Sequence, residues 1–290
     1  MTTMTNTLNT HNKEQGLGVK ARRRVAYWCK VLFGILFLLP IFVGLLFSFV
    51  PNELLLTVPK LKDVFTNLTF ENYVWVMTEL PMPRYFLNTI FVSFVVIIGS
   101  TILCSMAAYA FSFFRFPGRE FFFNLILVSM MIPGDVVIIA NYLQIQEWGL
   151  LNTYTALFIT SLVGGTDIFL IRQYFKQMPR EISEAAIMDG CGKWRFMVAI
   201  AMPMAKAPIV SLAITGFIGA YNMYFWPLLV TNKTEMRTVQ VGMAMLQSME
   251  NLFYGRVLAG AIICALVPTI LFLFAQDHII KGMSAGAVKG

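Results

Sequence analysis

Long apolar blocks alternate with short polar segments along the chain. Six of these blocks are each close to the roughly 20 residues that a helix needs to cross about 30 Å of hydrocarbon. Because hydrocarbon offers the backbone no hydrogen-bonding partner, each block is predicted to be a helix, and the fold class is all-α with six transmembrane helices. The blocks cover approximately residues 31–50, 88–114, 121–145, 153–171, 208–231 and 257–276.

Proline interrupts three of these blocks, at Pro40, Pro133 and Pro268. Since proline removes a helical hydrogen bond and clashes with the preceding turn, each is predicted to mark a kink whose freed carbonyl faces a neighbouring helix. Packing irregularity and a moving hinge remain alternative interpretations of these kinks.

The composition agrees with a polytopic membrane protein. Hydrophobic residues make up 58% of the chain, charged residues make up 13%, and the mean hydropathy is +0.70, which is too apolar for a soluble fold of this length. The net charge of +7 does not indicate a nucleic-acid partner, because the basic residues lie between apolar blocks rather than on one face. The four cysteines are scattered without metal-site or disulfide spacing and are interpreted as small buried hydrophobes.

Lysine and arginine are divided unevenly between alternate polar segments. With a cytoplasmic amino terminus, sixteen of the 22 basic residues fall inside and six fall outside, as the positive-inside rule requires for six spans. Both termini are therefore predicted to be cytoplasmic. The expected organisation is a disordered cytoplasmic tail (1–24), an uncleaved first transmembrane helix (25–50), an external segment (51–85), a core domain (86–277) with a cytoplasmic loop at about 172–206, and a cytoplasmic tail (278–290).

The polar insert at about 172–206 carries the most specific pattern in the chain. After Pro179, residues 180–189 are compatible with a short helix, and its acidic residues near the start suit the helix dipole. Gly190 and Gly192 are predicted to end it.

The same helix offers a surface to another protein. Ala185 and Ala186 are expected to form a shallow face that a groove in a partner approaches, and Glu184 offers a carboxylate to a basic group. An ordinary surface helix between two spans is the alternative interpretation.

The pattern Glu184-Ala185-Ala186-x3-Gly190, followed by Ile200-Ala201-Met202-Pro203, resembles the EAA loop of permease subunits in bacterial ATP-binding-cassette importers. Other motifs between about Arg84 and the carboxyl terminus are similar to the carbohydrate branch of these permeases, related to the smaller permease subunit of the maltose transporter. They include Asn88-Thr89-Ile90, Arg115-Phe116-Pro117-Gly118-Arg119, Met131-Ile132-Pro133-Gly134, Arg172-Gln173-Tyr174-Phe175, Trp226-Pro227-Leu228-Leu229-Val230 and Met236-Arg237-Thr238-Val239-Gln240-Val241-Gly242. The chain departs from the pattern of this family at two places. It has Tyr221-Asn222-Met223-Tyr224 where the family more often has tryptophan, asparagine and an acidic residue, and it has Asp135 where glutamine is common.

The resemblance implies a type I importer permease fold in the bacterial inner membrane. The chain would form half of a sugar pathway, with a second permease subunit, an ATPase dimer, an extracellular solute-binding protein and membrane lipid as partners. It is expected not to be an enzyme; ATP and Mg would be bound by the partner ATPase, since this chain has no Gly-x-x-x-x-Gly-Lys-Ser/Thr loop. The residues assigned to ATPase coupling are Glu184, Ala185, Ala186, Asp189, Gly190 and Pro203.

Candidate solute contacts are fewer. Asp135 and Asp167 lie in predicted spans, where a charge costs on the order of 2.5–3.5 kcal/mol on insertion scales and usually faces the bundle interior or a watery cavity. A structural ion pair, or hydration of Asp135 near the outer interface, is the alternative. Tyr221, Asn222 and Trp226 offer stacking faces and hydrogen-bonding groups to a sugar, or form an interfacial aromatic belt.

Other classes of protein remain open. An ion-coupled secondary transporter would also contain intramembrane aspartates, although it needs no EAA-like loop. A non-transporting membrane scaffold shares only the hydropathy. Within the importers, a glycerol phosphate fits as well as a sugar, and the sequence does not name the solute. No catalytic or metal-ligating set is recognised, since His11 and His278 are isolated near the termini.

Overall fold

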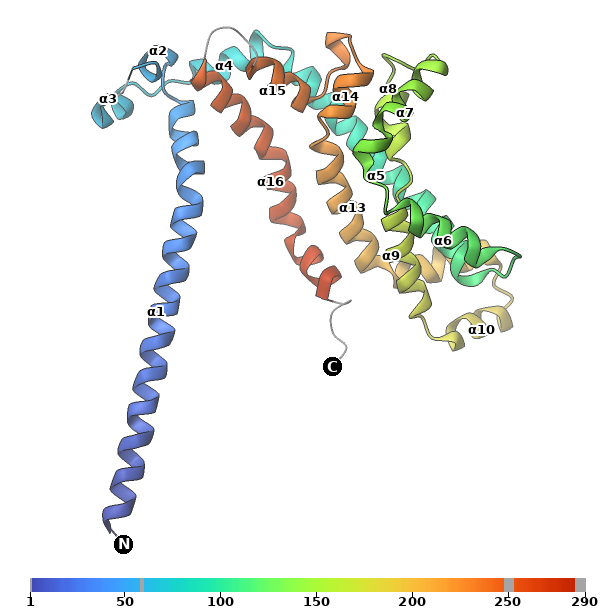
Figure 1. The fold of residues 1–290 in the computed structure, drawn as a ribbon, viewed down its shortest axis with the longest axis horizontal. Coiled ribbons are helices and arrows are strands. Elements are labelled where there is room, and N and C mark those ends of the chain that lie inside the picture. Colours follow the sequence, from blue (N-terminus) through green and yellow to red (C-terminus); the bar gives the residue numbers. More distant parts are fainter. Residues whose placement is uncertain (1, 58–59, 248–252, 285–290) are drawn as a thin grey trace. The chain divides into compact units, whose positions relative to one another are not determined.

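The computed structural model describes the backbone of residues 2–57, 60–247 and 253–284, and the side chains of residues 22–57, 60, 62–247 and 253–276. Every regular element in this part is helical, which confirms the all-α prediction (Figure 1). The α-helices are α1 (Thr2–Ser48), α2 (Asn52–Leu55), α3 (Leu61–Thr66), α4 (Glu71–Thr78), α5 (Met82–Phe113), α6 (Arg119–Ser129), α7 (Gly134–Glu147), α8 (Tyr154–Phe158), α9 (Gly165–Lys176), α10 (Arg180–Met188), α11 (Lys193–Phe196), α12 (Met202–Met204), α13 (Lys206–Tyr221), α14 (Phe225–Val230), α15 (Val239–Gln247) and α16 (Tyr254–Ser284). Two 3₁₀ turns, η1 (Ile159–Ser161) and η3 (Thr234–Met236), and the π-helical turn η2 (Met197–Ala201) complete the set.

The chain divides into two compact units, of which unit 1 contains Met1–Tyr73 and Phe253–Ile262. The apolar section of α1, Arg22–Ser48, has a mean hydropathy of 2.7, and only 6% of its apolar window is buried inside the protein. Its 27 residues reach about 40 Å at 1.5 Å per residue, enough to cross hydrocarbon. The helical backbone begins at Thr2, so residues 2–24 of the segment predicted to be a disordered tail, 1–24, belong to α1.

Side chains from the next helices secure the end of α1 within unit 1. The amide of Asn72 in α4 donates to the carbonyls of Ser48 (3.0 Å) and Val50 (2.8 Å), which the helix end leaves without partners. Gly255 lies against the carbonyl of Val50. A Cβ atom at position 255 would be only 2.9 Å from that carbonyl oxygen, which leaves no room for a side chain. The segment expected to be external, 51–85, contains the short helices α2, α3 and α4.

Unit 2 contains Val74–Leu252 and Ile263–Gly290 and is built around α5, against which α9, α13, α8 and α15 pack. In the described residues, α1, α5 and α16 are each long and apolar enough to cross a membrane, and three bent helix pairs raise the count to six spans if each pair is one span. The bends are 103° between α6 and α7, 47° between α8–η1 and α9, and 78° between α11–α12 and α13.

Three of the predicted continuous helices are broken. The block at 153–171 ends as α8–η1 at Ser161 and restarts as α9 at Gly165, with a bend of 47°. The block at 121–145 ends as α6 at Ser129 and restarts as α7 after Pro133, because proline lacks the amide donor and disfavours helical backbone in the residue before it. The block at 208–231 ends as α13 at Tyr221, and α14 restarts so that Pro227 falls in a first turn, where its missing donor costs little. Pro40 and Pro268, in contrast, lie inside continuous helices.

The amino-terminal end of α5 is joined to the segment around η3 by a set of hydrogen bonds that we call the η3 latch. The buried amide of Asn88 donates to the carbonyls of Glu235 (2.8 Å) and Arg237 (2.9 Å). The Thr89 hydroxyl accepts from the backbone N–H of Val239 at 2.9 Å. Two motifs that are about 150 residues apart in sequence thus satisfy each other's buried polar groups.

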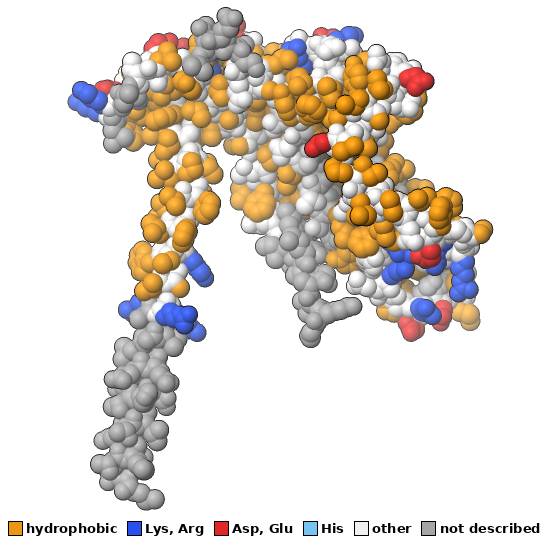
Figure 2. Space-filling view, viewed as in Figure 1, with side chains coloured by type: hydrophobic (Ala, Val, Ile, Leu, Met, Phe, Trp, Pro, Cys, Tyr) orange, Lys and Arg blue, Asp and Glu red, His pale blue; other side chains and the backbone are white. Residues whose placement is uncertain are grey.

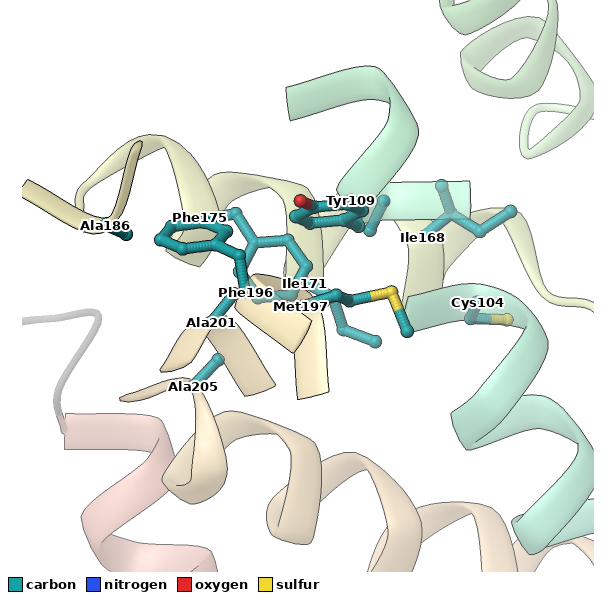
Figure 3. Close-up of a cluster of buried hydrophobic side chains, with 11 residues drawn as sticks. Cys104, Tyr109, Ile168, Ile171, Phe175, Ala186, Phe196, Met197, Ala201 and Ala205 are labelled. Carbon is teal, nitrogen blue, oxygen red and sulfur yellow. The ribbon is translucent and has the colours of Figure 1, made fainter. Parts of the chain in front are cut away.

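The other end of α5 enters a buried cluster with α9, α10 and α11 (Figure 3). Phe175 and Phe196 pack beside Tyr109, whose hydroxyl donates to the Lys193 carbonyl at 2.9 Å. Charged side chains gather outside this cluster at the α10 end of unit 2, whereas hydrophobic side chains cover its middle (Figure 2). The members of the cluster are Cys104, Ala108, Tyr109, Ile168, Ile171, Phe175, Ala186, Phe196, Met197, Ala201 and Ala205.

Candidate functional site

The helix predicted at 180–189 is present as α10, and its end is fixed by backbone geometry. Gly190 has a φ of +69°, in the left-handed region that glycine enters without a Cβ clash. The Cys191 N–H donates to the Ala186 carbonyl at 2.8 Å, and the Gly190 N–H donates to the Ile187 carbonyl at 3.0 Å. These two bonds form a Schellman motif, so the predicted stop at Gly190 is confirmed. Gly192, at φ −64°, is instead the N-cap of α11.

The exposed face of α10 differs from the predicted one. Ala186 retains only 6% of its exposure and packs into the cluster of Figure 3, so it anchors the helix rather than forming its surface. Ile187 and Met188 are instead 70% and 87% exposed. Glu184 and Ala185 lie on the exposed face as expected. The sequence carried a signal for the buried face of α10: Ile182 and Ala186 are one helical turn apart, and both pack against the cluster. Residues 187 and 188 then point away from that buried face.

The remaining two residues assigned to coupling lie apart from the face of α10. Asp189 is the exposed C-cap of the helix. Pro203 is exposed in α12, after the π-helical turn η2. There the N–H of Met202 donates to the carbonyl of Met197, five residues back. The ring of a helical proline collides with the carbonyl four residues before it, and a widened π turn relieves such a collision.

The first turn of α10 borders a polar cleft of about 640 Å³. Its charged lining consists of Arg115, Arg119, Lys176, Arg180 and Glu184. None of the ion pairs formed by the described side chains includes Glu184.

Arg172 has a structural role that the sequence analysis did not identify. Its side chain is 3% exposed, its guanidinium lies 3.3 Å from the Glu120 carboxylate and 3.6 Å from the Phe123 ring centroid, and it donates to the Phe111 carbonyl at 3.4 Å. From the sequence, this arginine was used only in the positive-inside count and in the motif Arg172-Gln173-Tyr174-Phe175. In the structure it ties α9 to α6 and to the end of α5.

The two aspartates occupy similar positions in different helices. Asp135 is exposed in the first turn of α7, and Asp167 is half-buried in the first turn of α9. Both positions are favourable for a carboxylate because the helix dipole is positive there. Asp167 shares a small cavity with Ser100 and Thr101 of α5. Among the side chains that the structure describes, no three His, Cys, Asp or Glu residues gather as metal ligands.

The aromatic candidates are mostly internal. Tyr221 is 1% exposed and its hydroxyl donates to the Cys264 carbonyl at 2.9 Å, while the indole N–H of buried Trp226 donates to the Ala156 carbonyl at 2.9 Å. Exposed stacking faces were therefore a wrong expectation for these two rings, whose polar groups are already satisfied inside the fold. Asn222 is exposed, and its side-chain oxygen accepts from Gln240 at 3.1 Å.

Comparison with known proteins gives consistent matches. Residues 100–285 match the family described as binding-protein-dependent transport system inner membrane component. The chain is 32% identical over 226 residues to the arabinooligosaccharides transport system permease protein AraQ of Halalkalibacterium halodurans, covering 78% of this chain and 81% of the relative. It is 34% identical over 204 residues to the sn-glycerol-3-phosphate transport system permease protein UgpE of Brucella melitensis, covering 70% and 72%. A chain of a bacterial ABC transporter involved in the import of the acidic polysaccharide alginate shares the fold, with a TM-score of 0.76 at 22% identity, over 87% of this chain and 94% of that one.

Proposed function

Because the chain belongs to the family of binding-protein-dependent transport system inner membrane components, we propose that it is the permease subunit of an ATP-driven sugar importer. Members of this family are multi-pass transport subunits of the membrane, and the reaction that drives transport is assigned here to a partner ATPase that binds ATP and Mg. The similar proteins named for arabinooligosaccharides and for sn-glycerol-3-phosphate support a solute rich in hydroxyl groups.

The exposed face of α10 is the observation that carries this proposal. Ile187 and Met188 project apolar side chains from a short helix whose end is fixed at Gly190 and whose buried side is anchored by Ala186. A rigid helix with apolar side chains on its outer face suits insertion into a groove of another protein. Glu184, on the same helix, supplies a carboxylate for a basic group of that groove.

The assembly that follows contains two different permease subunits, an ATPase dimer and an extracellular solute-binding protein. ATP binding closes the ATPase dimer, and α10 transmits the motion to the bundle through the cluster around Phe175 and Tyr109. Loaded binding protein biases the same two-state bundle from the opposite side of the membrane, which gives alternating access. In this scheme α10 and both termini are cytoplasmic.

Cysteines introduced at the two ends of unit 2 test this arrangement. Met188→Cys in α10 and Lys233→Cys after α14 would be made in a background in which the four native cysteines are replaced by alanine. Both residues are exposed, and the helices α10 and α14 lie at opposite ends of unit 2 (Figure 1). Met188→Cys is expected to cross-link to the ATPase in a nucleotide-dependent way, and Lys233→Cys to react with a membrane-impermeant thiol reagent in intact cells.

The reversed labelling pattern would refute the proposed orientation. Equal cross-linking of both cysteines to the ATPase would refute α10 as its docking element. An ion-coupled transporter or a membrane scaffold predicts no ATPase cross-link at either position.

For the solute pathway, Asp167 is the aspartate we propose to test first. Its carboxylate is half-buried beside Ser100 and Thr101 at a cavity of about 10 Å³, whereas Asp135 is exposed at a helix start. Asp167→Asn is expected to raise the KM for uptake while leaving assembly intact. Tyr221→Phe provides the matched control: it removes one buried hydrogen bond, worth about 1 kcal/mol, and should lower the Tm in detergent without changing KM. A normal KM with poor assembly for Asp167→Asn would assign Asp167 a structural role.

The solute class is tested separately. Uptake of a labelled oligosaccharide by cells that express the complete complex, competed by unlabelled sugars or by glycerol phosphate, distinguishes the two classes. Competition by glycerol phosphate alone would favour the second candidate, which rests on the similarity to the glycerol-3-phosphate permease.

A further inference from the structure

Three cations that form no ion pair with a described side chain line the cleft beside α10. Arg115 follows α5, Lys176 ends α9 and Arg180 begins α10, and all three line the cleft of about 640 Å³. Each of these side chains is exposed, and none forms an ion pair with another described side chain. Like charges brought together on one cleft repel each other unless an anion neutralises them. Coupling to an ATPase through the exposed face of α10 gives these three residues no role.

The other charged groups of the cleft do not neutralise them. Arg119 is held by Glu120, at 2.9 Å, and by the Phe114 carbonyl, at 3.1 Å. Glu120 also pairs with Arg172, at 3.3 Å, so its one negative charge is already shared by two arginines. Glu184 is the one free carboxylate among the described residues that line the cleft, against three free cations. The first turn of α10 also lines the cleft, and no side chain caps it, which adds the positive end of a helix dipole.

An aromatic surface adjoins the cations. A second cavity, of about 440 Å³, shares Arg115 and Arg119 with the cleft and is also lined by Phe116 and Phe121. Phe121 is 63% exposed. The two cavities together therefore offer positive charge beside an apolar wall, which is complementary to a molecule with an anionic group and a hydrocarbon chain.

The position of these two cavities in the fold indicates which kind of anionic, hydrocarbon-bearing molecule would bind there. Arg115 lies two residues after the end of the apolar helix α5, and Lys176 ends α9. The charged region at the α10 end of unit 2 borders the hydrophobic middle of that unit (Figure 2). This border is where phospholipid headgroups lie, and basic side chains there attract anionic lipids. We propose that the cleft binds the phosphate of an anionic phospholipid such as phosphatidylglycerol, with an acyl chain along Phe116 and Phe121.

The lipid would contact both helices that meet at Pro179. Its phosphate bridges Lys176 on α9 and Arg180 on α10, while Arg115 belongs to the segment after α5. Occupancy therefore holds the α9–α10 corner against α5 and makes the position of α10 depend on the composition of the surrounding membrane.

Lipid retention by the purified, complete complex tests the proposal. The complex is equilibrated in nanodiscs of equal phosphatidylglycerol and phosphatidylcholine with matched acyl chains, extracted in mild detergent, and its bound lipids are quantified by mass spectrometry. Phosphatidylglycerol should be enriched in the wild type, and Arg115→Gln/Arg180→Gln should lower the enrichment roughly tenfold or more. The control, Arg195→Gln/Lys206→Gln, removes the same charge from exposed residues outside the cleft lining and should keep the enrichment.

Three results would overturn the proposal. The first is equal enrichment in wild type and the cleft variant. The second is complete displacement of the lipid by about 10 mM inorganic phosphate, because a free anion that competes this well needs no acyl chain. The third is enrichment that appears only after the ATPase is removed, since the cleft would then be covered by protein in the working complex. Normal membrane insertion of the cleft variant, measured by its yield, separates loss of lipid from loss of folding.

Discussion

Substitution of Gly190 by valine is expected to reduce uptake by about tenfold or more while the chain still inserts in the membrane. A φ of +69° costs an ordinary L-residue about 1–2 kcal/mol, and a β-branched residue is a clear outlier there. The strain falls on the Schellman motif that fixes the last turn of α10, where Ile187 and Met188 are exposed. Uptake of labelled solute and co-purification of the ATPase measure the effect.

Two glycine-site controls separate this backbone effect from the effect of added bulk. Gly190→Asn should keep most activity, because asparagine tolerates the left-handed region. Gly192→Ser should be close to neutral, since Gly192 is an N-cap at φ −64° and a Cβ there meets no atom within 4 Å. Equal loss in Gly190→Val and Gly192→Ser would show that the loop is sensitive to any change, and that the turn at Gly190 has no particular role.

Charge reversal at Glu184 is expected to have an effect of similar size. The Glu184 carboxylate lies on the cleft with Arg115, Lys176 and Arg180, so lysine there adds a fourth free cation and repels the basic partner group that we propose. Breaking a partly desolvated charge pair costs about 2–5 kcal/mol, enough to abolish docking. We expect Glu184→Lys to be present at normal levels in the membrane but to show neither ATPase retention nor uptake.

The matched variant for this test is Glu181→Lys, which makes the same change in net charge three residues earlier on α10. It weakens the interaction with the helix dipole by about 0.3–1 kcal/mol and should leave most uptake intact. Glu184→Gln, which keeps the shape and one acceptor oxygen, should fall between wild type and Glu184→Lys. Identical behaviour of the two lysine variants would attribute the loss to overall charge and would contradict a specific contact at Glu184.

The local features of α10 were readable from sequence because each has a local cause. The backbone preferences of Pro179 and Gly190 predict where α10 begins and ends. In the structure Pro179 is the N-cap of the helix and Gly190 lies just past its end. The side of the helix that is buried depends on tertiary packing, and this is why Ala186 was assigned to the surface although Phe175 and its neighbours bury it. Hydropathy alone could not show which of the two alanines is buried, since Ala185 and Ala186 are identical residues with different surroundings.

Non-local partners explain the other differences. Pro133 predicted an irregularity, but proline alone does not fix the angle of 103° that the structure has between α6 and α7. Trp226 resembled an interfacial aromatic in sequence, and only the fold shows that the Ala156 carbonyl, 70 residues earlier, accepts its N–H. Arg172 likewise found its carboxylate at Glu120, 52 residues away.

The α5 helix connects the η3 latch to the cluster beneath α10 without a break. Thr89 at one end and Tyr109 at the other are 20 residues apart in one helix, which fixes them about 30 Å from each other. Because the helix has no break between these residues, we expect a displacement of the segment around Val239 to be transmitted as a shift or rotation at the Lys193 carbonyl. In mechanical terms α5 is a rigid connection that is held by hydrogen bonds at each end. Loss of the bond at Thr89 or of the bond at Tyr109 would uncouple the η3 latch from the cluster at α10 while leaving each of them folded.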